Sequence, residues 1–504
     1  MQGIGEWAVQ RAQLSGDKVA FVYGERSWTY GEFNDRTDRL ANQLRGRFGV
    51  RRGDRVAAVV ASSVECLEIL FASAKLGAIF TPINVRLTAP EIGYVLADLG
   101  AELLFAHGQF SQVPDALTEP GVRVRDVVTL GDEYDTLLSD GSSVPVPSQV
   151  DRHDVAVIMY TSGTTGRPKG AMLTHENLRA NAVAVTSAFG LRKSDVTITA
   201  LPMFHMGGLG LHTLPFIYLG ARNVILPSFD PTVVLELVAK ERATQLLLVP
   251  TMWQAVTAVP DLERYDLSSL DCALISGAPA PMAVLEFFAD LGIPIEEGFG
   301  MTECAPSVAK LDAEHVRTKA GSIGRSLFGI ETRIVDDRDQ DVPAGTVGEL
   351  LVRGDNVFVG YWMRPEESAE ALRGGWFHSG DLGWADEDGF ITLVDRRKDM
   401  LISGGENVYT REVELAIAQM PQVRDVAVVG AAHAKWGETP VAFVVAKDGE
   451  TLTEEEVIAF ARQRLAGFKT PTSVCFLAAL PTTATGKIQK NALRDRLSAT
   501  MSDG

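Results

Sequence analysis

A loop of glycine and small hydroxyl residues offers the clearest chemistry in this sequence. Residues 160–170 read Tyr-Thr-Ser-Gly-Thr-Thr-Gly-Arg-Pro-Lys-Gly. The loop follows an apolar run predicted as a buried strand (Val155–Tyr160) and precedes a predicted helix (Asn177–Ala188). Glycine and threonine allow several backbone N–H groups to converge on one anion, and Lys169 adds a positive charge. The loop therefore predicts a phosphate-binding site, although it is not a Walker A loop, because Gly170 follows the lysine where Ser or Thr would be required.

Further motifs rich in glycine and polar residues follow along the rest of the chain. They are Pro202–Gly208, Ser276–Pro279, Glu297–Glu303, Gly348–Leu350, Phe377–Gly383, Asp395–Asp399, Ile402–Asn407 and Pro481–Lys487. Together with residues 160–170 they resemble, in order and over the whole chain, the adenylate-forming superfamily of acyl-CoA synthetases, luciferases and peptide-synthetase adenylation domains. Bacterial fatty-acyl and aryl-CoA ligases are the members most similar to it. The resemblance implies that a carboxylic acid is joined to AMP and then passed to coenzyme A.

The resemblance also implies which residues bind ATP. They are Thr161, Ser162, Gly163, Thr164, Thr165, Gly166, Lys169, Gly277, Ala278, Gly298, Phe299, Gly300, Met301, Asp381 and Arg396. Asp381 is expected to accept hydrogen bonds from both ribose hydroxyls, a task that suits an acceptor-only carboxylate. Phe299 stands where the family usually has tyrosine, so it can stack on adenine but offers no phenol for a hydrogen bond.

Three residues are expected to act in the first chemical step. By resemblance, Thr302 hydrogen-bonds the α-phosphate and Glu303 is the Mg²⁺ ligand. A lone carboxylate suits Mg²⁺, which keeps waters and bridges phosphates. Lys487 is expected to stabilise charge on the carboxylate and α-phosphate as the acid attacks.

The second step is expected to need a turn of the C-terminal part of the chain. Lys398 falls at the hinge position of the family, and Gly404, Gly405 and Glu406 are expected to admit the pantetheine arm of CoA. Such a switch requires changes in only a few backbone torsions.

The acyl pocket is expected to include His205, Gly207, Gly208 and Thr251. From Leu201 to Ala221 the sequence contains no Asp, Glu, Lys or Arg. An amino acid or a dicarboxylate would leave a charge unpaired in such surroundings, so an apolar monocarboxylic acid is predicted. Gly207, Gly208 and Gly210 are expected to leave space for an aliphatic chain or a flat aromatic ring. His205 is either a gate of the pantetheine channel or a core histidine.

Length and pattern predict an α/β fold with a large multi-sheet N-terminal domain (1–397) and a small mobile α+β C-terminal domain (398–504). In the second part, helices are expected over Glu412–Gln419 and from a capping box at Thr453, with strands at Val426–Gly430 and Pro440–Val445. The charged run Asp395–Asp399 is either a solvated loop or the hinge between the two domains.

The composition excludes several other classes of protein. The net charge of −18 argues against nucleic-acid binding. The N-terminus lacks the apolar core of a signal peptide, and prolines and glycines in the uncharged stretch argue for a buried core rather than a membrane span. Four scattered cysteines indicate neither a disulfide framework nor a zinc site, which fits a cytoplasmic protein.

We therefore expect an AMP-forming acyl-CoA synthetase that uses ATP, Mg²⁺ and CoA, with a medium- or long-chain fatty acid as the first choice of substrate. The alternatives are an aryl-CoA ligase for cinnamate-, ferulate- or benzoate-type acids, and a stand-alone adenylating enzyme that loads a carrier protein. A non-catalytic AMP-binding regulator is disfavoured because a regulator could lose Lys487 and Glu303. Its partners are expected to be small molecules, and a homodimer is left open.

Overall fold

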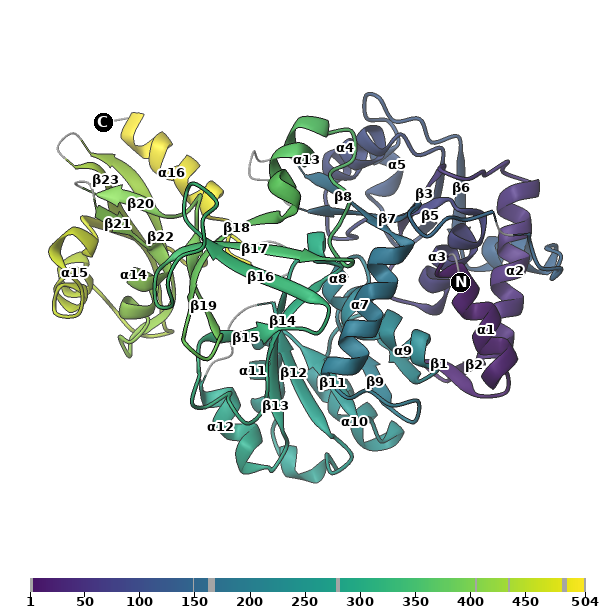
Figure 1. Cartoon of the computed structure of the whole chain (residues 1–504), viewed down its shortest axis with the longest axis horizontal. Coiled ribbons are helices and arrows are strands. Elements are labelled where there is room, and N and C mark those ends of the chain that lie inside the picture. Colours follow the sequence, from purple (N-terminus) through teal and green to yellow (C-terminus); the bar gives the residue numbers. More distant parts are fainter. Residues whose placement is uncertain are drawn as a thin grey trace. The chain divides into compact units, whose positions relative to one another are not determined.

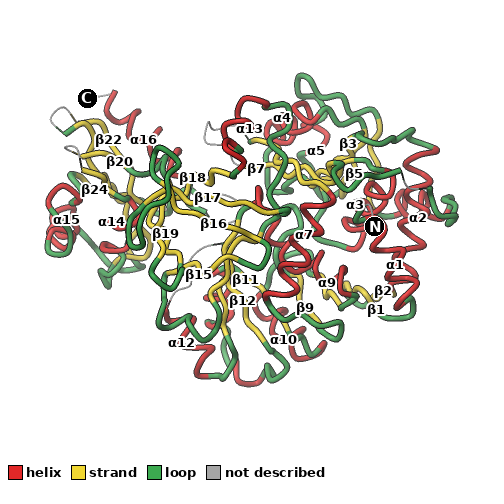
Figure 2. The backbone as a smooth tube through the Cα atoms, viewed as in Figure 1, coloured by secondary structure: helices red, strands yellow, loops and turns green. Residues whose placement is uncertain are grey.

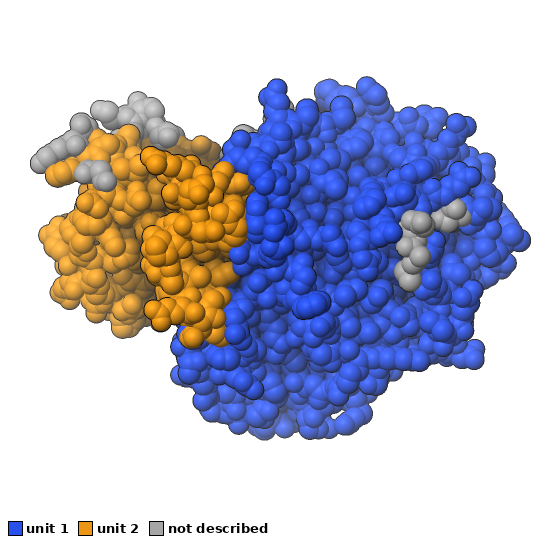
Figure 3. All heavy atoms as spheres, in the orientation of Figure 1, with its two compact units in different colours: residues 1–163, 167–332, 352–377 blue, residues 164–166, 333–351, 378–504 orange. Residues whose placement is uncertain are grey.

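The computed structural model describes residues 3–147, 149–161, 168–277, 282–403, 406–433, 436–482 and 487–502 (Figure 1). Two compact units make up the chain (Figure 3): unit 1 contains residues 1–163, 167–332 and 352–377, and unit 2 contains residues 164–166, 333–351 and 378–504. The predicted α/β class is confirmed. The predicted domain boundary between residues 397 and 398 lies inside unit 2. It stays a prediction, because a division into compact units does not show which residues move.

Helices and strands alternate along most of the chain (Figure 2). Up to the phosphate loop and just beyond it, the elements are α1 Gly5–Ser15, β1 Val19–Tyr23, β2 Arg26–Thr29, α2 Tyr30–Gly46, β3 Arg55–Val59, α3 Val64–Leu76, β4 Ile79–Pro82, α4 Ala89–Leu99, β5 Leu103–His107, α5 Val113–Ala116, β6 Asp126–Leu130, α6 Asp132–Ser139, β7 Val155–Thr161, β8 Lys169–Thr174 and α7 His175–Ala188. The next are β9 Val196–Thr199, α8 Met206–Gly208, the π-helix η1 Leu209–Thr213, α9 Leu214–Leu219, β10 Arg222–Ile225, α10 Pro231–Glu241, β11 Gln245–Leu248, α11 Pro250–Thr257, η2 Leu262–Arg264, β12 Cys272–Ser276, α12 Met282–Asp290, β13 Ile295–Gly300, η3 Thr302–Cys304, β14 Ser307–Leu311 and β15 Ser322–Ser326.

The remaining elements run to the C-terminal helix. They are β16 Ile330–Val335, β17 Gly348–Gly354, α13 Pro365–Ala371, η4 Arg373–Gly375, β18 Phe377–Ala385, β19 Ile391–Arg396, β20 Leu401–Ser403, β21 Glu406–Val408, α14 Thr410–Ile417, β22 Val423–His433, β23 Gly437–Ala446, α15 Glu454–Arg462, η5 Gly467–Lys469, β24 Ser473–Phe476 and α16 Lys490–Ser502.

One sheet of unit 1 has at its edge the two strands that flank the predicted phosphate loop. Its strand order is β6–β5–β3–β4–β7–β8, parallel from β6 to β7 and antiparallel between β7 and β8. The apolar face of α4, with Ile92, Leu96 and Leu99, packs in one buried cluster with Val59 and Leu104 of the sheet. That cluster fixes α4 beside the strands that lead into the loop.

A second sheet of unit 1 runs in the order β15–β14–β13–β12–β11–β9–β10–β1–β2. The strands from β13 to β1 are parallel, because the connections between them are long crossovers, most of them through helices. The carboxyl ends of parallel strands meet at one edge, where ligands bind in sheets of this kind.

The uncharged stretch from Leu201 to Ala221 is buried, as predicted. It forms α8, η1 and α9, and residues such as Leu211 and Phe216 pack in a cluster with Leu247 and Leu274 of the second sheet. Among the described residues, no helix combines the length and apolar character needed to cross a membrane.

The C-terminal part of unit 2 is a small α+β layer, as predicted. Its sheet has the order β21–β20–β23–β22, with β24 beside β23. Side chains alternate along β22: Val428 packs toward the cluster that contains α14 and α15, whereas Ala427 and Val429 share a cluster with Leu493 of α16. The predicted capping box at Thr453 is present.

Candidate active site

Several of the predicted site residues lie at the carboxyl edge of the second sheet of unit 1. Gly277 follows β12, and Gly298 sits near the end of β13 in register with Ser276. His205 lies in the segment after β9, and Thr251 is the second residue of α11, the helix after β11. Parallel strands therefore bring together residues that are far apart in sequence.

The turn that carries Thr302 and Glu303 follows β13 directly. The backbone N–H of Met301 donates to the carbonyl of Pro306 at 2.8 Å and closes the turn. A Cβ at Gly300 would stand 1.8 Å from that same carbonyl oxygen, so only glycine permits this close approach. Thr302 and Glu303 are both half-buried.

Glu303 is held from both its backbone and its side chain. The phenol of Tyr361 donates to its carboxylate at 3.0 Å, and the N–H of Phe358 donates to its carbonyl at 2.8 Å. Burial and the neighbouring Glu303 charge raise the pKa of Tyr361, so the phenol stays a donor. A half-buried carboxylate that accepts from a phenol fits the Mg²⁺ ligand set in which phosphates and waters supply the remaining oxygens.

The phosphate loop joins two strands, not a strand and a helix. Tyr160 and Thr161 at the end of β7 pair with Gly170 and Lys169 at the start of β8, and α7 begins only afterwards. The helix predicted over Asn177–Ala188 is present as α7, and strand β8, which the sequence did not predict, lies between the loop and this helix. Ser162, Gly163, Thr164, Thr165 and Gly166 lie outside the described residues, as does Ala278.

Both ends of the loop are tied to α4. The phenol of Tyr160 donates to the carboxylate of Asp98 at 2.8 Å, and that of Tyr94 donates to the carbonyl of Pro168 at 3.3 Å. The ammonium of Lys169 pairs with Glu367 of α13 and lies 5.5 Å from the centre of the Tyr361 ring. Lys169 and Glu303 thus approach the same tyrosine, one over its ring and one at its hydroxyl.

Two of the three glycines of the acyl segment do not provide space. A Cβ on Gly208 would stand 2.3 Å from the carbonyl oxygen of Pro202, and one on Gly210 would stand 2.8 Å from the carbonyl oxygen of Ala305. At Gly207 a Cβ would fit, because its nearest neighbour, Leu201 Cδ1, would be 3.9 Å away in ordinary van der Waals contact. The expectation that all three leave room is therefore wrong: Gly208 and Gly210 allow backbones to pack closely. His205 is half-buried and its ring packs edge-on against Phe204.

In unit 2, four predicted site residues gather near the β18–β19 hairpin. Asp381 pairs with Arg396 across the two strands, with Nε and Oδ1 3.1 Å apart. Burial raises the pKa of Asp381, and the nearby charges of Arg396, Lys487 and Lys398 act in the opposite direction. Lys487 is exposed but close enough to act on Asp381 through its charge.

The segment around Lys398 is tied to the C-terminal helices. Arg494 of α16 pairs with Asp399 at 2.6 Å and donates to the carbonyl of Lys398 at 3.4 Å. The carboxylate of Asp395 accepts from both the N–H and the hydroxyl of Thr410 at the start of α14. Of the predicted CoA-binding residues, Glu406 starts β21 and is exposed, whereas Gly404 and Gly405 lie outside the described residues.

Sequence reasoning missed three residues that support the site. Tyr361 and Glu367 contact Glu303 and Lys169, and Glu349 accepts from the N–H of Gly380, beside Asp381, at 3.1 Å. Glu349 stands in a motif that was recognised without a role. Tyr361 and Glu367 lie in no such motif, and a single sequence gives no signal for them.

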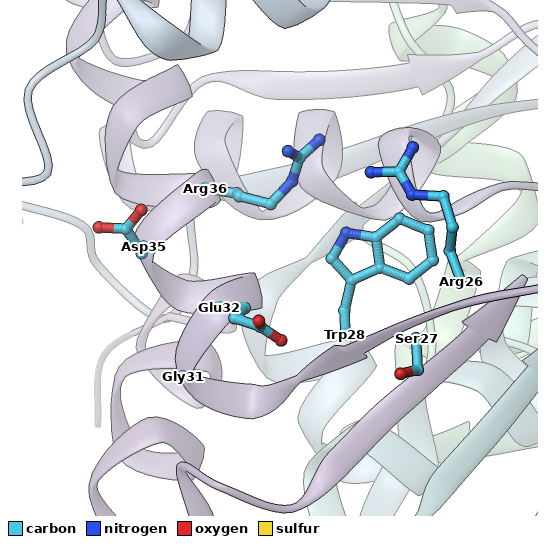
Figure 4. A pocket seen from close by; sticks show the side chains of 7 residues that line it. All are labelled: Arg26, Ser27, Trp28, Gly31, Glu32, Asp35 and Arg36. Carbon is cyan, nitrogen blue, oxygen red and sulfur yellow. The ribbon is translucent and has the colours of Figure 1, made fainter.

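A separate surface hollow of about 500 Å³ lies at the start of α2, lined by Arg26, Ser27, Trp28, Gly31, Glu32, Asp35 and Arg36 (Figure 4). Its charged groups already have partners within the protein. Arg36 pairs with the buried Glu68, and Glu32 caps α2. It therefore carries no functional assignment.

Comparison with known proteins shows the family. Residues 8–362 match the AMP-binding enzyme family, and residues 412–487 match the AMP-binding enzyme C-terminal domain. A feruloyl-CoA synthase of Amycolatopsis sp is 44% identical over 495 residues, covering 98% of this chain and 99% of that protein. An indoleacetate–CoA ligase of Aromatoleum aromaticum is 38% identical over 497 residues, covering 97% of each. The solved structure of a Mycobacterium tuberculosis fatty acyl CoA synthetase aligns with a TM-score of 0.83 and 34% identity over 99% of each chain.

The chain therefore belongs to the AMP-binding enzyme family, within the adenylate-forming superfamily. Its relatives, matched over nearly their whole length, are ligases that join an acid to CoA. The chain is accordingly an AMP-forming acid–thiol ligase, as the resemblance in the sequence implied.

Proposed function

We propose that this chain joins an aromatic carboxylic acid, of the ferulate or indoleacetate type, to CoA through an acyl-adenylate. The observation that carries the choice is the packing of the acyl segment. Neighbouring atoms fill the positions that a Cβ would take on Gly208 and Gly210, whereas a Cβ on Gly207 would meet only Leu201, at 3.9 Å. A compact flat acid suits such closely packed surroundings better than a long alkyl chain.

The surroundings of this segment are apolar, which also suits an aromatic ring. Phe204 and Met206 are buried, and Val249 and Met252 pack against the cluster formed by Leu201, Leu211 and their neighbours. An aromatic acid buries a large apolar area and leaves only its carboxylate to be bound by polar groups.

The comparisons support an aromatic acid over a fatty acid. The feruloyl-CoA synthase shares 44% of its residues with this chain, whereas the fatty acyl CoA synthetase shares 34%. The sequence alone favoured a medium- or long-chain fatty acid and held an aryl acid as the alternative. We now place the aryl acid first.

In the first step, a carboxylate oxygen of the acid forms a bond to the α-phosphorus of ATP, and the bond from that phosphorus to pyrophosphate breaks. Lys487 offsets the negative charge that gathers on the reacting oxygens, and Thr302 donates to the α-phosphate. Glu303 would hold Mg²⁺, which neutralises phosphate charge when bound. Asp381 accepts from the ribose hydroxyls, with Arg396 beside it.

In the second step, the sulfur of CoA attacks the acyl carbonyl carbon, its thiol proton is released, and AMP leaves. We assign the entry of the pantetheine arm to residues Gly404, Gly405 and Glu406, and the change between steps to torsions at Lys398. The ties of Asp399 to Arg494 and of Asp395 to Thr410 would have to adjust during such a turn.

The test is ATP- and CoA-dependent release of AMP with a panel of acids, with the thioester identified by mass. Ferulate, cinnamate, benzoate and indoleacetate are compared with hexanoate, octanoate and palmitate. We expect kcat/KM for the best aryl acid to exceed that for every aliphatic acid by at least about tenfold, which corresponds to about 1.4 kcal/mol of discrimination. A larger kcat/KM with octanoate or palmitate would overturn the aromatic assignment and restore the fatty acid.

A further inference from the structure

Three buried asparagines surround the turn that carries Thr302 and Glu303. Asn177 and Asn181 lie one helical turn apart on α7, and Asn356 follows β17. All three have side chains that are at most 5% exposed. Buried amides normally have hydrogen-bond partners, so their partners indicate what they hold in place.

Asn356 binds the turn from one side. Its amide group donates to the carbonyls of Cys304 and Ser307, each at 2.8 Å, and so spans the residues that follow Glu303. Both amide hydrogens are used on backbone acceptors. Asn177 in turn donates to the carbonyls of Asp355 and Val357 at 2.8 Å, which fixes the backbone on either side of Asn356.

Asn181 binds the same turn from α7 and joins it to the acyl segment. Its carbonyl oxygen accepts from the N–H of Ser307 at 3.1 Å, and its amide donates to the carbonyl of Gly210 in η1 at 2.6 Å. The contact is reinforced because Gly210 packs directly against Ala305 and Pro306, where a Cβ would stand 2.8 Å from either. One side chain therefore bridges the predicted metal-binding turn and the π-helix beside the predicted acyl pocket.

The turn needs such support because it is not a relaxed conformation. Ala305 has φ of +63°, in the left-handed region that L-residues other than glycine rarely adopt. A residue in this region costs free energy and persists only where its surroundings impose it. The amide of Asn356 binds the backbone of Cys304, just before Ala305, and both asparagines bind the backbone of Ser307, two residues after it, so they constrain the backbone on either side of Ala305.

We propose that Asn181 and Asn356 are positioning residues for the ligase reaction: they hold Thr302 and Glu303 in place, and Asn181 also couples this turn to the acyl segment. The proposal rests on the proposed roles of Thr302 and Glu303. Neither asparagine touches a reacting group, so each acts through the turn. Outer residues that orient a metal ligand typically contribute about 10- to 100-fold to metal affinity or activity.

The variants Asn356→Asp and Asn181→Asp test this with little change in shape. In Asn356→Asp, a carboxylate would face the two carbonyls that the amide now binds. In Asn181→Asp, the bond from Ser307 remains possible, whereas the bond to Gly210 is lost. The matched control is Asn42→Asp, because Asn42 donates to the carbonyls of Ser142 and Val144, each at 2.8 Å, and none of these residues is assigned to the site.

The first measurement needs neither acid nor CoA. The rise in apparent Tm caused by ATP is followed as Mg²⁺ is titrated. We expect the Mg²⁺ midpoint to rise about 10- to 100-fold in Asn356→Asp and Asn181→Asp, and to stay unchanged in Asn42→Asp. In turnover, Asn181→Asp should also raise the KM for the acid, whereas Asn356→Asp should mainly lower kcat.

A purely structural role would lower the apparent Tm of both variants and leave the Mg²⁺ midpoint and the KM for the acid unchanged, and that result would overturn the proposal. If an aspartate variant does not fold, the serine variant at the same position (Asn356→Ser or Asn181→Ser) replaces it, and the same rise in the Mg²⁺ midpoint is expected. If MgATP stabilises the wild-type protein but the protein ligates no aryl acid, the proposed aryl substrate is refuted. The Mg²⁺ titration still tests the positioning role, because it uses neither acid nor CoA. A wild-type protein that ATP stabilises equally without Mg²⁺ would overturn the role of Glu303 and the positioning role with it.

Discussion

Replacing Asp381 by asparagine should remove the recognition of the ribose without removing the pocket around it. Asp381 is 5% exposed and its carboxylate is paired with Arg396 at 3.1 Å, so asparagine keeps the shape and loses the charge. A carboxylate can accept from both hydroxyls of a vicinal diol, whereas the amide offers a single oxygen acceptor and places an N–H₂ donor against the second hydroxyl.

The expected preference for ATP over an analogue that lacks one ribose hydroxyl follows from the hydrogen bond that this hydroxyl makes. A hydrogen bond to a charged group contributes about 1.5–3 kcal/mol, and one between neutral groups contributes about 0.5–1.5 kcal/mol. The wild-type protein should therefore prefer ATP over 3′-deoxy-ATP by about 10- to 150-fold in kcat/KM, and Asp381→Asn by less than about tenfold. The assay is AMP release at saturating acid and CoA with each nucleotide in turn.

The matched control is Asp38→Asn, because Asp38 is a buried carboxylate that pairs with Lys75 at 2.7 Å. This change should lower stability and leave the preference between the nucleotides unaltered. Since burial raises the pKa of Asp381, the wild-type preference should also weaken as the pH falls through that raised pKa, and the variant should lack this dependence. If Asp381→Asn discriminates between the nucleotides as strongly as the wild type, the ribose assignment is wrong.

Three further predictions concern chemistry, packing and pH. Lys487→Ala should reduce acid-dependent pyrophosphate exchange about 100- to 1000-fold while largely sparing thioester formation from pre-made acyl-adenylate; equal loss in both steps would contradict its assignment to the first. Gly300→Ala should cost about 1–3 kcal/mol and lower the apparent Tm, because its Cβ would stand 1.8 Å from the Pro306 oxygen. Gly46→Ala, with no atom within 4 Å, should not lower the Tm. Burial lowers the pKa of the His175 imidazole from 6.5 to about 4. Between pH 6.5 and 4 the unfolded chain therefore protonates this histidine and the folded chain does not, so the free energy of unfolding should fall as the pH drops from 6.5 to 4. His175→Asn should flatten this dependence in thermal melts, and an unchanged slope would refute it.

Local signals predicted the elements of the fold well. The apolar run Val155–Tyr160 became β7, and the helix predicted over Asn177–Ala188 became α7, because each has the side-chain periodicity of its structure. Thr453 caps α15 through the box that its spacing to Glu456 indicates. The hairpin between β7 and β8 was missed, since Lys169–Thr174 is short and lies against a predicted helix, where periodicity cannot separate the two.

The site was predictable only where a motif carries it. Asp381 and Arg396 were named from separate motifs, and pairing across β18 and β19 places them together. Tyr361 and Asn356 carry no pattern, because their importance arises from backbone and carboxylate partners about fifty residues away in sequence. The glycines of the acyl segment were misjudged for a related reason: a sequence shows that a side chain is absent, but not whether backbone already occupies its place.

The contrast between Gly300 and Gly207 has a consequence for how such enzymes diversify. At Gly300 a carbonyl oxygen already occupies the volume of a side chain, whereas nothing lies nearer than 3.9 Å to a Cβ on Gly207. Mutations at Gly300 are expected to be eliminated whatever acid the enzyme uses, whereas mutations at Gly207 are expected to survive and, under the proposed role of this segment in binding the acid, to alter the range of acids. Descent from a common ancestor can therefore change the substrate in small inherited steps without interrupting the ATP chemistry on which every version depends.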